Sequence, residues 1–94
     1  MAGEIVLDLA GSRIRLSRAV AQLLRDAAAR GAGSSTPQRD LSLVLARAIE
    51  SGSLVALQRS EIRALLGLFE RDEVPSTAQT AELLAAARDA VVGR

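Results

Sequence analysis

Six residue types are missing from this sequence: histidine, cysteine, tryptophan, tyrosine, lysine and asparagine. Without histidine and cysteine, the chain cannot build the usual zinc sites, ligate haem, use a thiol or form a disulfide. Without lysine, it lacks the phosphate-binding lysine of P-loop proteins and cannot form a Schiff base. The groups left for chemistry are hydroxyls, eleven carboxylates and twelve arginines. We therefore predict that the chain is not an enzyme and that it needs no metal or cofactor.

Long hydrophobic runs are also missing. The longest uninterrupted apolar stretch has about five residues, whereas a membrane-spanning helix needs roughly 20. The first residues do not have the basic start and apolar run of a signal peptide. We expect a soluble, cytoplasmic protein that does not contact a membrane.

The apolar content is high for the length. With 94 residues the chain has room for one domain, and we expect residues 1–94 to fold as a single globular unit. Apolar residues make up 49% of the sequence, and so small a domain has a large surface for its volume. Some apolar side chains should therefore remain outside, where a contiguous patch usually marks a partner surface. This favours self-association or binding to another protein.

Three short segments have the pattern of β-strands. Apolar and polar residues alternate through residues 4–16, interrupted by Ala10-Gly11, which is typical of a β-hairpin. Residues 54–57 are a short apolar run between polar flanks, which predicts a third, buried strand.

Four other segments have the apolar spacing of amphipathic helices. The predicted starts are the N-cap Ser17, Thr36-Pro37, Arg59 or Ser60, and the N-cap Ser76. The predicted fold is therefore α+β and mainly helical, with a β-hairpin and one further short strand packed against about four helices in the order ββααβαα.

The spacing also predicts which helix faces are buried. The expected core stripes of the first and third helices are Val20, Leu23, Leu24 and Ala27, and Ile62, Leu65, Leu66 and Phe69. Ala64 and Leu68 are set off from the second of these stripes, so we expect them to be exposed and open to a partner. Leu83 and Val91 of the final helix are candidates for the same surface, with packing inside the chain's own fold as the alternative.

The segment before the first helix is echoed later in the chain. Residues 14–16 precede Leu23-Leu24 much as residues 55–57 precede Leu65-Leu66, at a spacing of 41 or 42 residues. Duplication of a strand–helix unit would explain this echo, and so would chance in a sequence rich in alanine and leucine.

Arginines gather in the first half of the chain. Residues 1–47 hold seven arginines and four acidic residues, whereas residues 48–94 hold five and seven. A basic face on the hairpin is one possible nucleic-acid surface, although the net charge is only +1 and stacking aromatics are scarce. A solvated, ion-paired face is the simpler interpretation. The candidate nucleic-acid-binding residues are Arg13, Arg15, Arg18 and Arg59.

The residues Gly11-x-x-Ile14-x-Leu16-Ser17, followed by Leu23-Leu24, resemble the start of a response-regulator-type winged-helix domain. The resemblance covers roughly residues 5–30. No recognition helix and no C-terminal hairpin follow in the pattern, so the resemblance implies DNA binding without assigning any residue to it.

Two further motifs have structural interpretations. Gly31-x-Gly33-x-x-Thr36 resembles a phosphate-binding loop, but no clear strand precedes it and no lysine follows. The acidic cluster of Glu70, Asp72 and Glu73 is interpreted as a solvated turn.

Taken together, the sequence predicts a non-enzymatic protein–protein interaction module with a regulatory or assembly role. We expect it to act as a homo-oligomer or in a hetero-complex, with DNA binding as the alternative.

Overall fold

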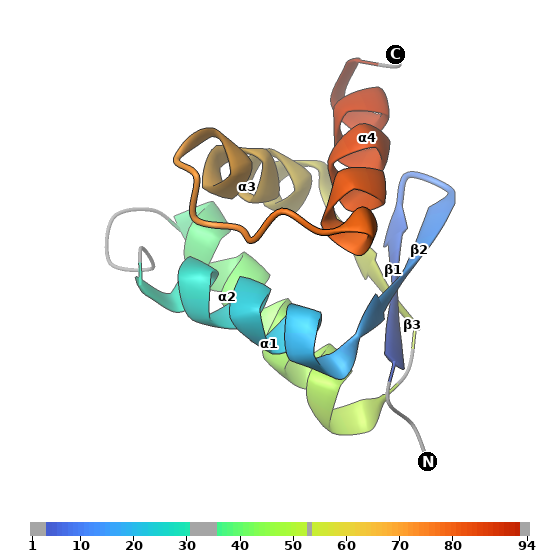
Figure 1. Ribbon diagram of the computed structural model, residues 1–94, viewed down its shortest axis with the longest axis vertical. Coiled ribbons are helices and arrows are strands. Elements are labelled where there is room, and N and C mark those ends of the chain that lie inside the picture. Colours follow the sequence, from blue (N-terminus) through green and yellow to red (C-terminus); the bar gives the residue numbers. More distant parts are fainter. Residues whose placement is uncertain (1–3, 31–35, 53, 93–94) are drawn as a thin grey trace.

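The computed structural model describes residues 4–30, 36–52 and 54–92. It confirms the α+β fold and the predicted order of elements. In Figure 1 the strands lie along one side of the molecule, where they form a sheet, and the helices are packed against one face of this sheet. The elements are β1 (Glu4–Leu9), β2 (Ser12–Ser17), α1 (Arg18–Arg30), α2 (Thr36–Ser51), β3 (Leu54–Leu57), α3 (Arg59–Glu70) and α4 (Ala78–Val92).

The hairpin turns through two residues. Leu9 is opposite Ser12 in the antiparallel pair of β1 and β2, which leaves Ala10 and Gly11 as the loop. Both loop residues have positive φ angles, 55° and 98°, as a type I′ turn requires. The Gly11 N–H donates to Asp8 Oδ1 at 2.7 Å, which ties the turn to the end of β1.

The three-stranded sheet has the order β2-β1-β3, and β3 is parallel to β1. The prediction that β3 is buried is wrong, because this order places it at the edge of the sheet. Leu54 is 45% exposed and Ala56 is exposed, while Leu57 is buried. The strand was predicted correctly, but its place in the sheet leaves half of its side chains outside.

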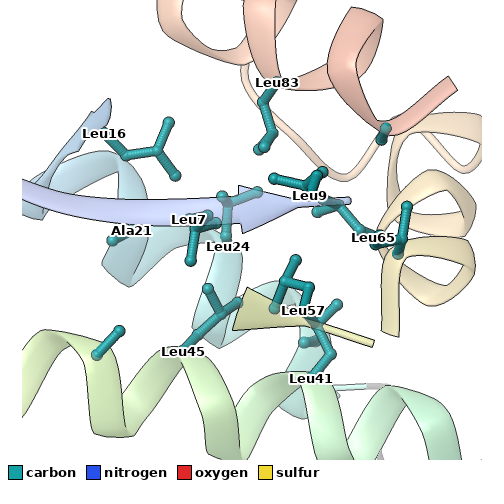
Figure 2. Packing of buried hydrophobic residues seen from close by; sticks show 14 of the residues in the cluster. Leu7, Leu9, Leu16, Ala21, Leu24, Leu41, Leu45, Leu57, Leu65 and Leu83 are labelled. Carbon is teal, nitrogen blue, oxygen red and sulfur yellow. The ribbon is translucent and has the colours of Figure 1, made fainter. Parts of the chain in front are cut away.

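The core lies between the inner face of the sheet and the helices, and every helix and strand contributes a leucine to it. The alternation in β1 points Leu7 and Leu9 into the core, where they are at most 1% exposed. Figure 2 shows them surrounded by side chains from the other elements. These include Leu16, Leu24, Leu41, Leu45, Leu57, Leu65 and Leu83.

The buried face of α1 differs from the prediction. Leu24 and Ala27 are buried as expected, but Leu23 is 49% exposed and Ala21 is fully buried. The helix follows β2 without a linker, and the Val20 N–H donates to the Ser17 Oγ cap at 3.2 Å. The start of α1 is therefore tied to the sheet, and small alanines lie on the side that packs closely against the core.

The buried face of α3 also differs from the predicted one. Leu68 is fully buried together with Leu65, whereas Leu66 and Phe69 are only partly buried. From Ala64 to Phe69 every position of this helix is apolar or glycine, so more than one face of this stretch satisfies the helical spacing. The predicted exposure of Leu68 is wrong because the helix presents the face carrying Ile62 and Leu65 to the core, and Leu68 continues that face.

The echo in the sequence corresponds to a repeated arrangement. After β1, the chain twice runs through a strand followed by two helices. Positions 41 residues apart are buried in both halves, namely Leu16 and Leu57, Ala21 and Ile62, Leu24 and Leu65, and Ala27 and Leu68. Burial thus repeats at a spacing of 41 residues, whereas the 42-residue match of Leu23 with Leu65 is not reflected in burial, because Leu23 is exposed.

Candidate functional site

A groove of about 360 Å³ lies between α3, the connecting segment and α4. Its apolar wall is formed by Leu66 and Phe69 from α3, Val74 from the connection and Leu84 from α4. All four are only partly buried. Phe69 is the one aromatic residue of the sequence. The groove, which we call the α3–α4 groove, therefore leaves large apolar side chains open to solvent.

The end of α3 shapes one side of this groove. The Asp72 N–H donates to the Phe69 carbonyl at 3.1 Å, and the Glu73 N–H donates to the Leu68 carbonyl at 3.0 Å. Asp72 has a φ angle of 59°. These two bonds and the left-handed residue are those of a Schellman motif, which reverses the chain after a helix. The predicted acidic turn thus has a defined geometry.

The start of α4 shapes the other side. Ser76 was predicted to cap this helix, but the cap is Thr77, one residue later. The Thr80 N–H donates to Thr77 Oγ1 at 3.1 Å, and the Thr77 N–H donates to Thr80 Oγ1 at 2.8 Å. The Thr80 hydroxyl also donates to the Pro75 carbonyl at 2.7 Å. A single side chain, 2% exposed, therefore holds the connecting segment in place.

Charged side chains flank the apolar wall. Glu70 and Asp72 line the groove from the end of α3, and Arg88 lines it from α4. The ion pairs found among residues 4–30, 36–52 and 54–92 are Arg25–Asp26 and Arg71–Glu73. The three charges of the groove take part in neither pair, so they are open to a partner.

The predicted partner-binding residues do not form one surface. Leu68 and Leu83 are fully buried in the core, so neither is accessible on the outside of the chain. Ala64 and Val91 are half-buried, and Ala64 lines a separate hollow with Arg63 of the same helix. The groove uses their neighbours Phe69 and Leu84 instead.

The candidate arginines are likewise separated. Arg13 and Arg15 are exposed on the outer face of β2, where they lie opposite Asp8 and Val6 of β1. Arg18 begins α1 at the far end of β2. Arg59 follows β3 on the other side of β1, and its Nη2 donates to the Val91 carbonyl at 3.0 Å. The structure therefore places two of the four arginines together.

Neither a metal site nor a membrane span is found in residues 4–30, 36–52 and 54–92. No three acidic side chains there gather where they could hold a metal ion. Of the four helices, none is both long and apolar enough to cross a membrane. The phosphate-loop motif at residues 31–36 lies outside the described residues except for Thr36.

Comparison with protein-family models, with curated proteins and with solved structures finds no match.

Proposed function

We propose that this protein is a non-enzymatic protein–protein interaction module that receives an apolar side chain of a partner in the α3–α4 groove. The observation that carries the proposal is the partly exposed wall of Leu66, Phe69 and Leu84 in a concave site. Half of the lining residues are polar or charged, so the apolar wall can hold an anchor while the polar groups fix its orientation. A regulatory or assembling role fits a groove that recognises a partner in a chain without histidine, cysteine or lysine.

The charges of the groove define the partner further. Glu70 and Asp72 lie beside the apolar wall at the end of α3. The C-terminus of a helix is the negative end of its dipole, so carboxylates there are repelled by it. A cation placed beside them is stabilised by the carboxylates and by the helix dipole. Arg88 lines the groove from α4, so the three charges leave a net charge of −1 that lies on the α3 side. The preferred partner is a segment with a leucine or phenylalanine anchor and a neighbouring arginine or lysine placed at the end of α3.

The groove is preorganised for such a segment. Thr80 fixes the connection through its bonds to Thr77 and Pro75, so little of the wall has to be ordered when a partner binds. Burying one leucine-sized anchor contributes about 2 kcal/mol. We therefore expect short peptides to bind weakly, and a partner that also covers the rim of the groove to bind more tightly.

The test is a titration of the protein with short amphipathic peptides carrying a leucine or phenylalanine anchor and flanking arginines. The expected result is binding that shifts the NMR signals of Leu66, Phe69 and Leu84. Ala81→Arg should abolish binding, because Ala81 is an exposed residue lining the groove. Ala85→Arg is the matched control, because Ala85 is exposed on α4 but does not line the groove. Equal binding of peptides with flanking glutamates, or no effect of Ala81→Arg, would contradict the proposal.

DNA binding is the second candidate, and the observation that favours it is the exposed pair Arg13 and Arg15 on the outer face of the sheet. Asp8 opposite Arg13 counts against it, because its carboxylate reduces the positive potential there. The test is binding to a DNA duplex at increasing salt. DNA binding predicts an affinity that falls steeply with salt and falls again in Arg13→Ala and Arg15→Ala. Absence of binding at low salt would remove this candidate.

A further inference from the structure

The two edges of the sheet differ in how well they are protected. Exposed strand edges pair readily with other strands, and proteins usually block them with charges, proline or a covering element. The β2 edge carries Arg13 and Arg15, and the Ser17 N–H at its end donates to Gln79 Oε1 of α4 at 2.9 Å. The β3 edge has the sequence Leu-Val-Ala-Leu and no charge.

The free side of β3 also exposes apolar side chains. In the strand order β3 has β1 on one side and no strand on the other among the described residues. The hairpin register directs the backbone groups of Val6 towards β3, and Val6 is paired with Leu54. In a parallel pair the backbone groups of Leu54 and Ala56 then face the free edge. Leu54 is 45% exposed and Ala56 is exposed, both on the outer face of the sheet.

We propose that β3 pairs antiparallel with β3 of a second copy of this chain, which joins two sheets into one of six strands. This surface is separate from the α3–α4 groove, and the inference does not depend on the function proposed for the groove.

The sequence of β3 is self-complementary in this arrangement. With the two-fold axis at Val55, Leu54 of one copy faces Ala56 of the other, and the two Val55 side chains face each other. Each apolar side chain on the outer face thus gains an apolar neighbour, and such cross-strand pairs are what stabilise a sheet. A two-fold pairing is also closed, so it ends at a dimer.

Charges at the two ends of β3 select the antiparallel orientation. The exposed Glu50 lies near the C-terminal end of α2, just before β3, and the exposed Arg59 begins α3, just after it. One N–H group of Arg59 donates to the Val91 carbonyl, and the guanidinium has further N–H groups for a second acceptor. Antiparallel pairing brings Glu50 of one copy to the end of the strand where the other copy has Arg59, twice in the dimer. Parallel pairing would place like charges side by side. The helix ends add to this, because the C-terminus of α2 is the negative end of a dipole and the N-terminus of α3 is the positive end of another.

The experiment is sedimentation equilibrium of the full chain over a wide concentration range. The expected result is a monomer–dimer equilibrium. Leu54→Lys should lower the association constant at least about tenfold, because it places a positive charge on the β3 edge of both copies. Leu23→Lys is the matched control and should leave the equilibrium unchanged, because Leu23 is 49% exposed on α1, away from the edge. Circular dichroism checks that both variants remain folded.

A charge-reversal pair tests the orientation. Glu50→Arg and Arg59→Glu should each weaken the dimer about fivefold, and the double variant should restore it. A chain that stays monomeric at every concentration would overturn the proposal. So would a dimer that survives Leu54→Lys, and if Ala81→Arg dissolves that dimer, the self-contact is in the groove instead. Loss of peptide binding in Ala81→Arg with an intact dimer shows that the two surfaces act separately.

Discussion

Replacement of Thr80 by valine tests the element that positions the groove. The Thr80 side chain is 2% exposed, and its Oγ1 accepts from the Thr77 N–H at 2.8 Å and donates to the Pro75 carbonyl at 2.7 Å. Valine has nearly the same shape, so the change removes these two bonds and leaves the packing in place. What is lost is therefore the attachment of the connecting segment to α4.

The expected cost is about 2 kcal/mol, because each bond contributes roughly 1 kcal/mol net and the groups left behind are only partly buried. For a domain of this size the loss corresponds to a fall in Tm of roughly 10 °C. The measurement is urea unfolding, combined with hydrogen exchange of the Thr77 amide, which should lose protection. Thr80→Ser is the control, because it keeps the hydroxyl and should keep that protection. If the free energy of unfolding of Thr80→Val lies within about 0.5 kcal/mol of the wild-type value and the Thr77 amide is still protected, the reasoning is refuted.

Four further substitutions test the fold by the same unfolding measurement. Leu24→Ala should cost about 3 kcal/mol because Leu24 is fully buried, whereas Leu23→Ala should cost less than about 1 kcal/mol; equal costs would contradict the observed rotation of α1. Ala10→Asn should raise the free energy of unfolding by roughly 0.5 kcal/mol, because asparagine tolerates the positive φ angle at this turn position better than alanine does. Asp72→Gly should raise it by about 0.5–1 kcal/mol for the same reason at the end of α3, and a loss at either position would show that the side chain has another role.

The order and type of the elements were predictable because each rests on local chemistry. The alternation on both sides of Ala10-Gly11 describes a hairpin without reference to the rest of the chain. Ser17 caps α1 as predicted, with its hydroxyl accepting from the Val20 N–H. These interactions join groups that are a few residues apart in sequence, so they do not depend on how the elements pack.

The burial of individual side chains was less predictable, because it depends on contacts distant in sequence. A short apolar run such as that of β3 occurs in central strands and in edge strands alike, so its sequence does not tell which position it takes. The strand order of the sheet decides this. In α3, Leu66 and Leu68 satisfy the helical spacing on different faces, and packing against the sheet selects Leu68.

The α3–α4 groove could not be predicted from spacing, since it is formed by two helices and a segment that reverses direction between them. Phe69 was expected in the core, but it is half-buried at the groove, as is Leu84 of α4. The positive φ angle of Asp72 and the bonds of Thr80 set the approach of the helices. The left-handed Asp72 has no strong sequence signal, because a left-handed residue after a helix is usually glycine.

The two proposed surfaces lead to a joint prediction about avidity. The groove lies between α3 and α4 and the pairing edge is β3, so a dimer would keep two grooves related by the two-fold axis. Two anchor peptides joined by a flexible linker that spans both grooves should bind more tightly than one anchor, by a factor on the order of 100. Leu54→Lys should remove this gain while leaving the affinity for a single anchor unchanged, as measured by calorimetry. An equal loss of single-anchor binding in Leu54→Lys would show that the edge of the sheet and the groove are coupled through α3, and the two surfaces would then have to be treated as one site.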